Sequence, residues 1–204
     1  HRLALETLES RLTPSAATDL QVTNLYRVLL ERQPEAPALA AWSAALESGR
    51  VTVGQMVEQV MHSPEYTNRV VTGSYQWYLD RNPEAAGQAA QAGALRSGVS
   101  QERVDAGILG SDEYFTRQGS TNLGFVQGLY RDVLGREADS AGLQAHLASL
   151  ARGVSRTDLA FCFLICAELG TQVAGTTYQQ VLGRDGSPKE LKNWANLLAN
   201  TARQ

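Results

Sequence analysis

The chain lacks any apolar run long enough to cross a bilayer. Its longest apolar stretch, from Leu159 to Ala167, falls well short of the ~20 residues that a membrane-spanning helix needs. Positive charge is also scarce, because 18 Lys and Arg face 21 Asp and Glu and give a formal net charge of −3. Proteins that grip a phosphate backbone carry an excess of positive charge, so the sequence disfavours nucleic acid as a partner.

Cysteine and histidine are too few for a metal or redox centre. The two cysteines, Cys162 and Cys166, are four residues apart on one predicted helix face and form no C-x-x-C motif. A structural zinc site needs four ligands, so we interpret both cysteines as small buried hydrophobic residues. The three histidines, His1, His62 and His146, do not pair at helical spacing. We therefore expect neither metal nor cofactor.

Sequence patterns of the common catalytic sites are also missing. The chain contains no G-x-S-x-G, no P-loop and no G-x-G-x-x-G. The segment 183–188 is rich in turn residues but lacks the alternating oxygen ligands and the distal Glu of a calcium-binding EF-hand. No segment alternates apolar and polar residues as a strand does. The sequence thus predicts an all-α protein that is not an enzyme.

What the chain does contain is an internal repeat. Each copy has a tyrosine, a leucine four residues after that tyrosine and an arginine six residues after the same tyrosine. The tyrosines are 49, 55 and 48 residues apart. The signature residues are Tyr26 and Arg32, Tyr75 and Arg81, Tyr130, Leu134 and Arg136, and Tyr178 and Arg184. We predict four divergent units of about 50 residues that pack into one globular body. Their predicted boundaries are 1–17 for an N-terminal segment, then 18–69, 70–119, 120–170 and a truncated 171–204.

Each repeated position has a physical reason. Tyrosine and leucine at i and i+4 share one face of a first helix, so Leu134 should lie in the core. An acidic or hydroxyl residue three after the arginine suits the start of a second helix, and an Arg136–Asp139 ion pair would brace the corner. Glycines such as Gly153 suit the residue after that helix, where φ is positive. Hydroxyl residues then predict further helix starts at Thr52, Ser100 and Ser155, and short fourth helices at Ser63 and Ser111.

The third copy resembles a known family. Its signature L-Y-R-x-V-L-G-R-x-x-D-x-x-G-L, from Leu129 to Leu143, is similar to the bacterial domain of unknown function DUF4214. The second copy departs from it, with Gln88 where the third has Leu143. The resemblance implies a part of a secreted or cell-surface bacterial protein, without established catalytic or binding residues. The family is distantly similar to the phycobilisome linker domains that organise light-harvesting antennae.

The N-terminus carries a further short pattern. Residues 5–14 resemble the L-E-x-L-E-x-R-x-x-P motif found near the start of some secreted bacterial proteins. The same leucines, Leu3, Leu5, Leu8 and Leu12, would equally suit an ordinary amphipathic helix. Both interpretations stay open at this point.

Two functions remain from the sequence. The first is a non-catalytic structural or protein-interaction module, which could also self-associate. The second is a module that binds a surface glycan or peptide through a groove between repeats, with Trp42, Trp77 and Trp194 as contacts. Trp77 lies away from the Tyr75 and Tyr78 face, so it is either exposed or packed on a neighbouring repeat. Burial is the commoner state for so large an aromatic.

Overall fold

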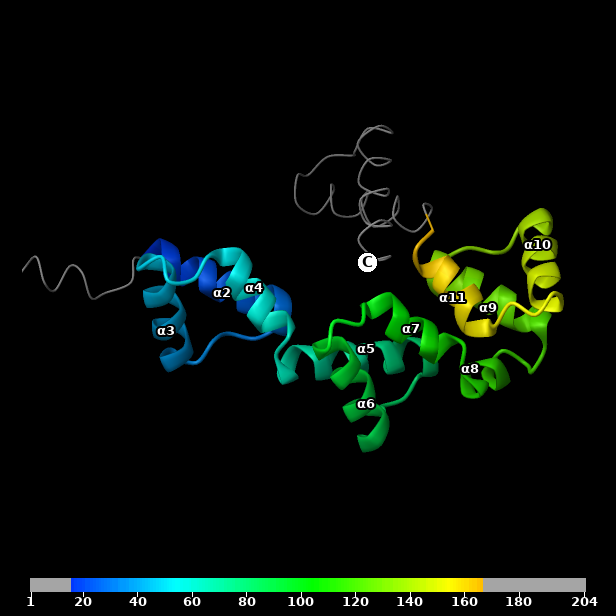
Figure 1. Cartoon of the computed structure of the whole chain (residues 1–204), viewed down its shortest axis with the longest axis horizontal. Helices are drawn as coiled ribbons and strands as arrows, with labels where there is room; N and C mark the ends of the chain where they lie inside the picture. The colour runs from blue at the N-terminus through cyan, green and yellow to red at the C-terminus, as the bar shows by residue number, and fades with distance from the viewer. Residues whose placement is uncertain (1–15, 167–204) are drawn as a thin grey trace, which may run out of the picture. The chain divides into compact units, whose positions relative to one another are not determined.

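The computed structural model describes residues 16–166, and its regular structure in that range is entirely α-helical. The all-α prediction is therefore confirmed (Figure 1). The helices in chain order are α2 (Ala16–Leu30), α3 (Ala36–Glu47), α4 (Val53–Met61), α5 (Pro64–Leu79), α6 (Ala85–Arg96), α7 (Gln101–Leu109), α8 (Asp112–Arg117), α9 (Asn122–Leu134), α10 (Ser140–Ala151) and α11 (Arg156–Leu164). The predicted segment 1–17, apart from its last two residues, and the predicted fourth copy lie outside the described residues.

The chain divides into two compact units. The first unit holds the residues up to Val71 together with Gln88–Arg96, and the second holds Thr72–Gly87 and the residues from Ser97 onward. The division runs inside α5 and α6, so these two helices contribute to both units. The count of four repeats and their boundaries remain predictions, because a division of the chain into compact units does not test where one sequence repeat ends and the next begins.

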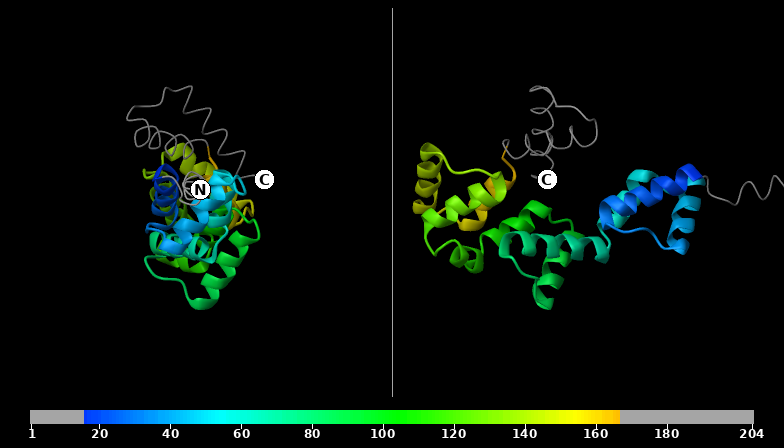
Figure 2. Two further views of the ribbon diagram at one scale, coloured as in Figure 1. Left: turned by 90° about the vertical axis from the view of Figure 1, so that its left-hand side faces the viewer. Right: turned by 180° about the vertical axis from the view of Figure 1, so that it is seen from behind.

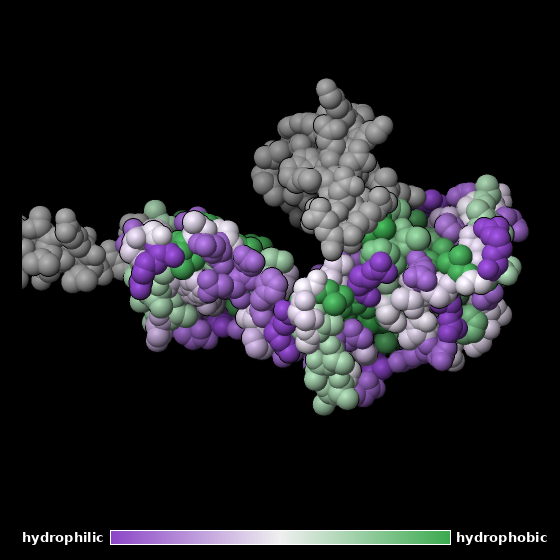
Figure 3. All heavy atoms as spheres, viewed as in Figure 1, coloured by the Kyte–Doolittle hydropathy of each residue, from purple (hydrophilic) through white to green (hydrophobic). Residues whose placement is uncertain are grey.

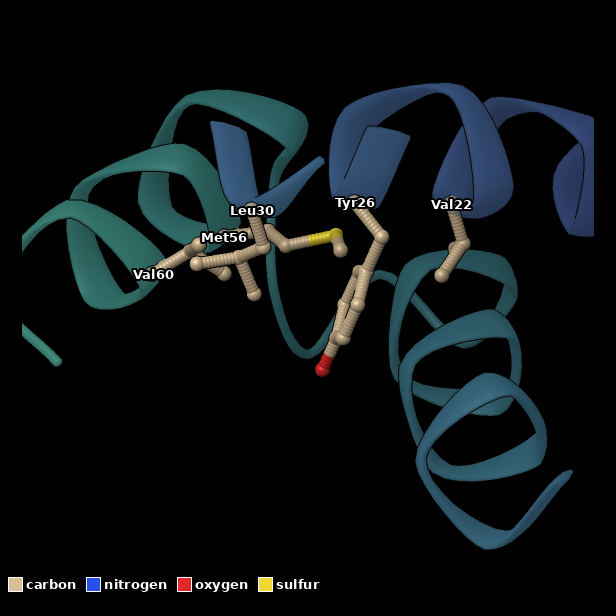
Figure 4. Close-up of a cluster of buried hydrophobic side chains, with 5 residues drawn as sticks. All are labelled: Val22, Tyr26, Leu30, Met56 and Val60. Carbon is tan, nitrogen blue, oxygen red and sulfur yellow. The ribbon is translucent and has the colours of Figure 1, made fainter. Parts of the chain in front are cut away.

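The core of the first unit joins α2 to α4. Val22, Tyr26 and Leu30 come from α2 at successive four-residue steps, and Met56 and Val60 come from α4. Figure 4 shows Leu30 meeting the two α4 side chains, while Tyr26 and Val22 project from α2 nearby. Helix α3 packs beside α2, and its Trp42 and Leu39 lie against this cluster.

The core of the second unit is built around α7, α9 and α11. Helix α11 lies beside α7 and α9, as the views of Figures 1 and 2 agree. Tyr114 of α8 is fully buried and meets Phe125 of α9 edge-on, with ring centroids 6.0 Å apart. Tyr130 meets Phe163 of α11 in the same manner at 5.0 Å. Edge-to-face packing of this kind adds to the stabilisation from burial alone.

Hydroxyl side chains start the helices where the sequence predicted. Thr52 and Gln55 form the reciprocal capping box of α4. Ser100 caps α7, Ser111 caps α8 and Ser155 caps α11, each by accepting a backbone N–H three residues on. Each cap satisfies a donor that the helix itself leaves unpaired, which stabilises the helix by ~1 kcal/mol.

The prediction of a short helix at Ser63 is wrong. Ser63 does accept the N–H of Tyr66, but the helix that follows is α5, which continues for 16 residues to Leu79. At the corresponding point of the next copy, Gly119 and Ser120 adopt positive φ of 87° and 55° and separate α8 from α9. No residue of α5 has a positive φ, so nothing reverses the chain there.

Positive φ also marks the ends of the helices. Gly49, Gly98 and Gly153 have φ of 68°, 92° and 93°, which confirms the prediction for the residue after each second helix. The residue just before the repeat arginine shares this conformation in the three described copies, and among these three only the third has glycine there. Gly135 has φ of 63°, whereas Glu31 and Asp80 hold φ of 53° and 51° without the freedom of glycine.

Asp80→Gly should stabilise the protein by about 0.5–1 kcal/mol, because it removes the steric cost of a side chain at positive φ. Removal of the carboxylate should cost little stability, since the Asp80 side chain is 89% exposed and its ion pair with Arg117 is long at 3.9 Å. Gly135→Ala should have the opposite effect and a similar size. Urea denaturation followed by circular dichroism measures both. A loss of stability in Asp80→Gly would show that the ion pair outweighs the backbone strain.

Candidate functional site

The repeat arginine of the first copy, Arg32, is the centre of a polar cluster in the first unit. Arg32 follows the positive-φ residue at the end of α2, which turns its side chain back over the ring of Tyr26 at 5.3 Å. Its Nε and Nη2 donate to the two carboxylate oxygens of Glu65 at 2.5 and 2.8 Å. Its Nη1 donates to Glu35 at 2.9 Å. We call this arrangement of tyrosine, arginine and two carboxylates the arginine brace.

The second unit contains the same brace from the next copy. Arg81 lies 5.1 Å from the ring centroid of Tyr75. It donates through Nε and Nη2 to Glu113 at 2.5 and 2.6 Å and pairs with Glu84 at 2.8 Å. The match extends to single atoms, because the same two guanidinium nitrogens hold the distant carboxylate in both copies.

The third copy repeats the parts of the brace that fall within the described residues. Arg136 lies 4.9 Å from the ring of Tyr130, and its Nη1 is 3.6 Å from Asp139. The predicted Arg136–Asp139 ion pair is therefore confirmed. Asp139 also caps α10 by accepting the N–H of Gly142 at 2.8 Å. By the repeat pattern the distant carboxylate would be Glu168, which lies outside the described residues.

The electrostatics of the brace favour fixed charges. Hydrogen bonds from Arg32 hold the pKa of Glu65 below its usual range, and those from Arg81 do the same for Glu113. The backbone N–H of Gly142 is the main cause of the lowered pKa of Asp139, and Arg136 adds to it. The carboxylates in turn raise the pKa values of Arg32 and Arg81. Groups that stay ionised throughout the neutral range neither take up nor release protons there, so the brace suits structure better than acid–base catalysis.

The aromatic residues named as ligand contacts have different surroundings. Trp42 packs against the first core and donates from Nε1 to the Tyr26 hydroxyl at 3.1 Å. Trp77 is 72% exposed, and its Nε1 donates to the backbone oxygen of Asp132 at 3.1 Å. Trp194 lies outside the described residues. The structure thus places Trp42 and Trp77 in separate units rather than together.

Histidine and cysteine positions differ in how well they were predicted. His146 occupies the repeat position of Trp42 and lies against Phe163, with the ring centroids 4.7 Å apart and the planes tilted by 47°, and burial lowers its pKa. His62 is the residue that caps the C-terminus of α4, and its Nδ1 lies 2.8 Å from the Glu58 backbone oxygen. The burial predicted for the cysteines is wrong, because Cys162 is exposed and Cys166 is half-buried. Cys162 lies on α11, whose Leu159 and Phe163 are buried, and Cys166 follows the end of this helix.

Three features of the structure were not predicted from the sequence. Glu65 and Glu113 were not expected as partners of the arginines, although they follow Arg32 and Arg81 by 33 and 32 residues. Asp105 is a buried carboxylate that accepts the Ser74 hydroxyl at 2.6 Å. Helix α2 carries an exposed apolar stripe that includes Leu20 and Val28. Only the repeated glutamates left a signal that the sequence could have revealed.

The described residues show neither a metal-binding cluster nor a membrane-spanning helix. Among residues 16–166, no three His, Cys, Asp or Glu side chains gather as a metal site would require. Within the same range, no helix combines the length and apolarity needed to traverse a bilayer. In the view of Figure 3, polar and apolar residues intermingle over the coloured surface.

Fold and brace together define an all-α helical domain whose repeated polar residues hold helix corners in place. Residues 106–173 match the family model described as Domain of unknown function (DUF4214). The match supports the resemblance for this part of the chain, which runs from within α7 past α11. No curated protein matches the chain, and no solved structure matches it either.

The geometry explains the family-like signature in the matched region. Tyr130, Leu134, Arg136 and Asp139 are respectively the ring of the brace, a buried core residue, the guanidinium and the helix cap. The glycine of the signature, Gly142, leaves room for the Tyr130 hydroxyl, which lies 2.2 Å from where a Cβ would stand. A side chain there would force the Tyr130 ring out of this position.

Proposed function

We propose that this protein is a non-catalytic structural or protein-interaction module. The observation that carries the proposal is the recurrence of the arginine brace. Arg32, Arg81 and Arg136 occupy the same place in three successive copies, and each stacks on its tyrosine and pairs with a carboxylate. An enzyme needs one specialised site, whereas a repeated structural contact serves a domain that holds its shape to present surfaces.

The proposal includes a location. The resemblance of this chain to DUF4214 associates it with secreted and cell-surface bacterial proteins, so we place this module outside the cell or on its surface. Protease treatment of intact cells tests this placement. A surface module is digested while a cytoplasmic marker survives, and protection of both proteins would contradict the location.

Light scattering on a size-exclusion column tests the assembly role. We expect the mass of the full chain to grow from that of the 22.1 kDa monomer as the concentration rises over a hundredfold range. The same series with and without calcium separates an assembly that depends on the ion from one that does not. A monomer at every concentration, in both conditions, would contradict a self-assembling scaffold.

A second function is favoured by one observation. The indole of Trp77 is 72% exposed while the Asp132 oxygen holds its N–H, so a face of the ring can stack on a sugar or anchor a peptide. Titration of envelope polysaccharide into the protein should then quench tryptophan fluorescence. Trp77→Leu should abolish the quenching, whereas Trp42→Phe should retain it. Equal quenching in wild type and Trp77→Leu would exclude this residue as the contact.

A further inference from the structure

Helix α2 presents an uncovered apolar stripe on the side away from its core. Leu20 is 60% exposed and Val28 is 75% exposed, and Val53 from α4 adds to the same surface at 37%. Together with Ala17 and Leu25 they line an open groove of about 400 Å³ in the first unit. The residues recur at the three- and four-residue spacing that places side chains on one helix face. Contiguous exposed apolar surface of this kind marks a place where something binds.

The third copy shows what covers the same face there. When Tyr26 is aligned with Tyr130, the groove residues Leu20 and Asn24 correspond to Gly124 and Gly128 of α9. The backbone oxygen of Gln118 lies 1.9 Å from the position that a Cβ on Gly124 would take. The side chain of Gln118 lies 2.6 Å from the position that a Cβ on Gly128 would take. Gln118 belongs to the segment that leads directly into α9.

Helix α8 continues this covering layer. The rings of Tyr114 and Phe115 lie 6.0 and 6.3 Å from that of Phe125, which corresponds to Gln21 at the edge of the groove. The residues before the first helix of the third copy therefore fold back over its outer face. In the first copy, the residues in the same chain position are those before Ala16.

The sequence of that preceding segment complements the groove. Leu5, Leu8 and Leu12 fall on one side if residues 3–12 are helical, and Pro14 favours a change of chain direction just before α2. A helix of this length spans ~15 Å, and the groove from Ala17 to Val28 spans ~17 Å along α2. Where α9 has Gly124 and allows close backbone approach, α2 has Leu20, which suits leucine side chains instead.

We propose that residues 3–12 of this chain fold back antiparallel to α2 and fill the groove, with Leu5, Leu8 and Leu12 against Leu20, Leu25 and Val28. A tethered segment has the advantage over a second molecule, because its effective concentration at the groove reaches the millimolar range.

Cross-linking of engineered cysteines tests the proposal in the full chain with Cys162 and Cys166 replaced by serine. Glu9→Cys is combined with Gln21→Cys, at the edge of the groove, or with Arg27→Cys, which is exposed to one side of it. A short bismaleimide should link the first pair within one molecule several-fold faster than the second. Adding Leu8→Glu and Leu12→Glu should remove this preference, and circular dichroism verifies that this variant folds.

The other outcomes overturn the proposal. Equal rates for the two pairs would mean that the segment does not dock on the groove. Products of twice the chain mass, formed faster with Gln21→Cys, would assign the groove to a second copy. The light-scattering result stands independently, so failure of this inference leaves the proposed assembly role to its own test.

Discussion

Leu134→Ala is expected to lower the free energy of unfolding by about 2–5 kcal/mol. Leu134 ends α9 and is 5% exposed, so truncation leaves a cavity as well as removing apolar contact. The equivalent leucines of the other described copies, Leu30 and Leu79, are also buried at 8% and 2%. A repeated leucine that is buried each time is a core residue, and its loss should cost more than most surface changes.

Leu123→Ala provides the matched control. Leu123 lies on the same helix, but it is 47% exposed. Its truncation removes the same atoms without a buried cavity, so we expect less than about 1 kcal/mol of change. Urea denaturation followed by circular dichroism gives both values. Equal losses of unfolding free energy in the two variants would show that Leu134 is not a core residue and would contradict the alignment of the copies.

Asp105→Asn is expected to stabilise the protein by about 1–3 kcal/mol at pH 8. Asp105 is 6% exposed, and burial raises its pKa from 3.8 to about 6, even though the Ser74 hydroxyl favours the ionised form. Above that pH the folded protein must hold a buried negative charge near the Tyr78 side chain and near the carboxylate of Glu102, which repels it. Asparagine keeps an oxygen for the Ser74 hydroxyl but carries no charge.

The pH dependence of this effect follows from the direction of the shift. Because the pKa of Asp105 is higher in the folded state, the folded protein binds a proton at this carboxylate more tightly than the unfolded chain does. Its contribution to stability is fully present below the unfolded value and is lost as the pH rises through about 6. The advantage of Asp105→Asn should therefore be largest at pH 8 and mostly absent at pH 4.

Denaturation at the two pH values checks the prediction. Glu137→Gln serves as the control, because Glu137 is exposed and should change stability little at either pH. An Asp105→Asn variant that is less stable than wild type at pH 8 would show that the charged hydrogen bond with Ser74 outweighs burial. A gain of the same size at both pH values would have a cause other than ionisation.

The sequence predicted those parts of the fold that short segments determine. Thr52, Ser100 and Ser155 start helices because a hydroxyl cap acts over three residues. Gly49 and Gly153 end helices because glycine adopts positive φ without steric cost. The continuous helix α5 was missed because its extent depends on whether the chain reverses after Tyr66, which one serine cap does not determine.

Long-range pairing limited what could be predicted of the site. The sequence indicated Asp139 as a partner of Arg136, since the two are three residues apart. Glu65 and Glu113 lie more than 30 residues from their arginines, and only the packing of the helices brings them together. The burial of Asp105 depends in the same way on the packing of α7, and a polar residue in a helix gives no local sign of it.

We infer that the repeated arginine stabilises the fold. A double-mutant cycle between Arg32→Gln and Glu65→Gln tests it most directly, with Arg136→Ala and Asp139→Ala as the comparison. We expect a coupling of about 0.5–1 kcal/mol for the bidentate Arg32–Glu65 pair and a smaller one for the longer Arg136–Asp139 contact. Additive effects of Arg32→Gln and Glu65→Gln, with no coupling between them, would show that the arginine does not stabilise the fold through this carboxylate.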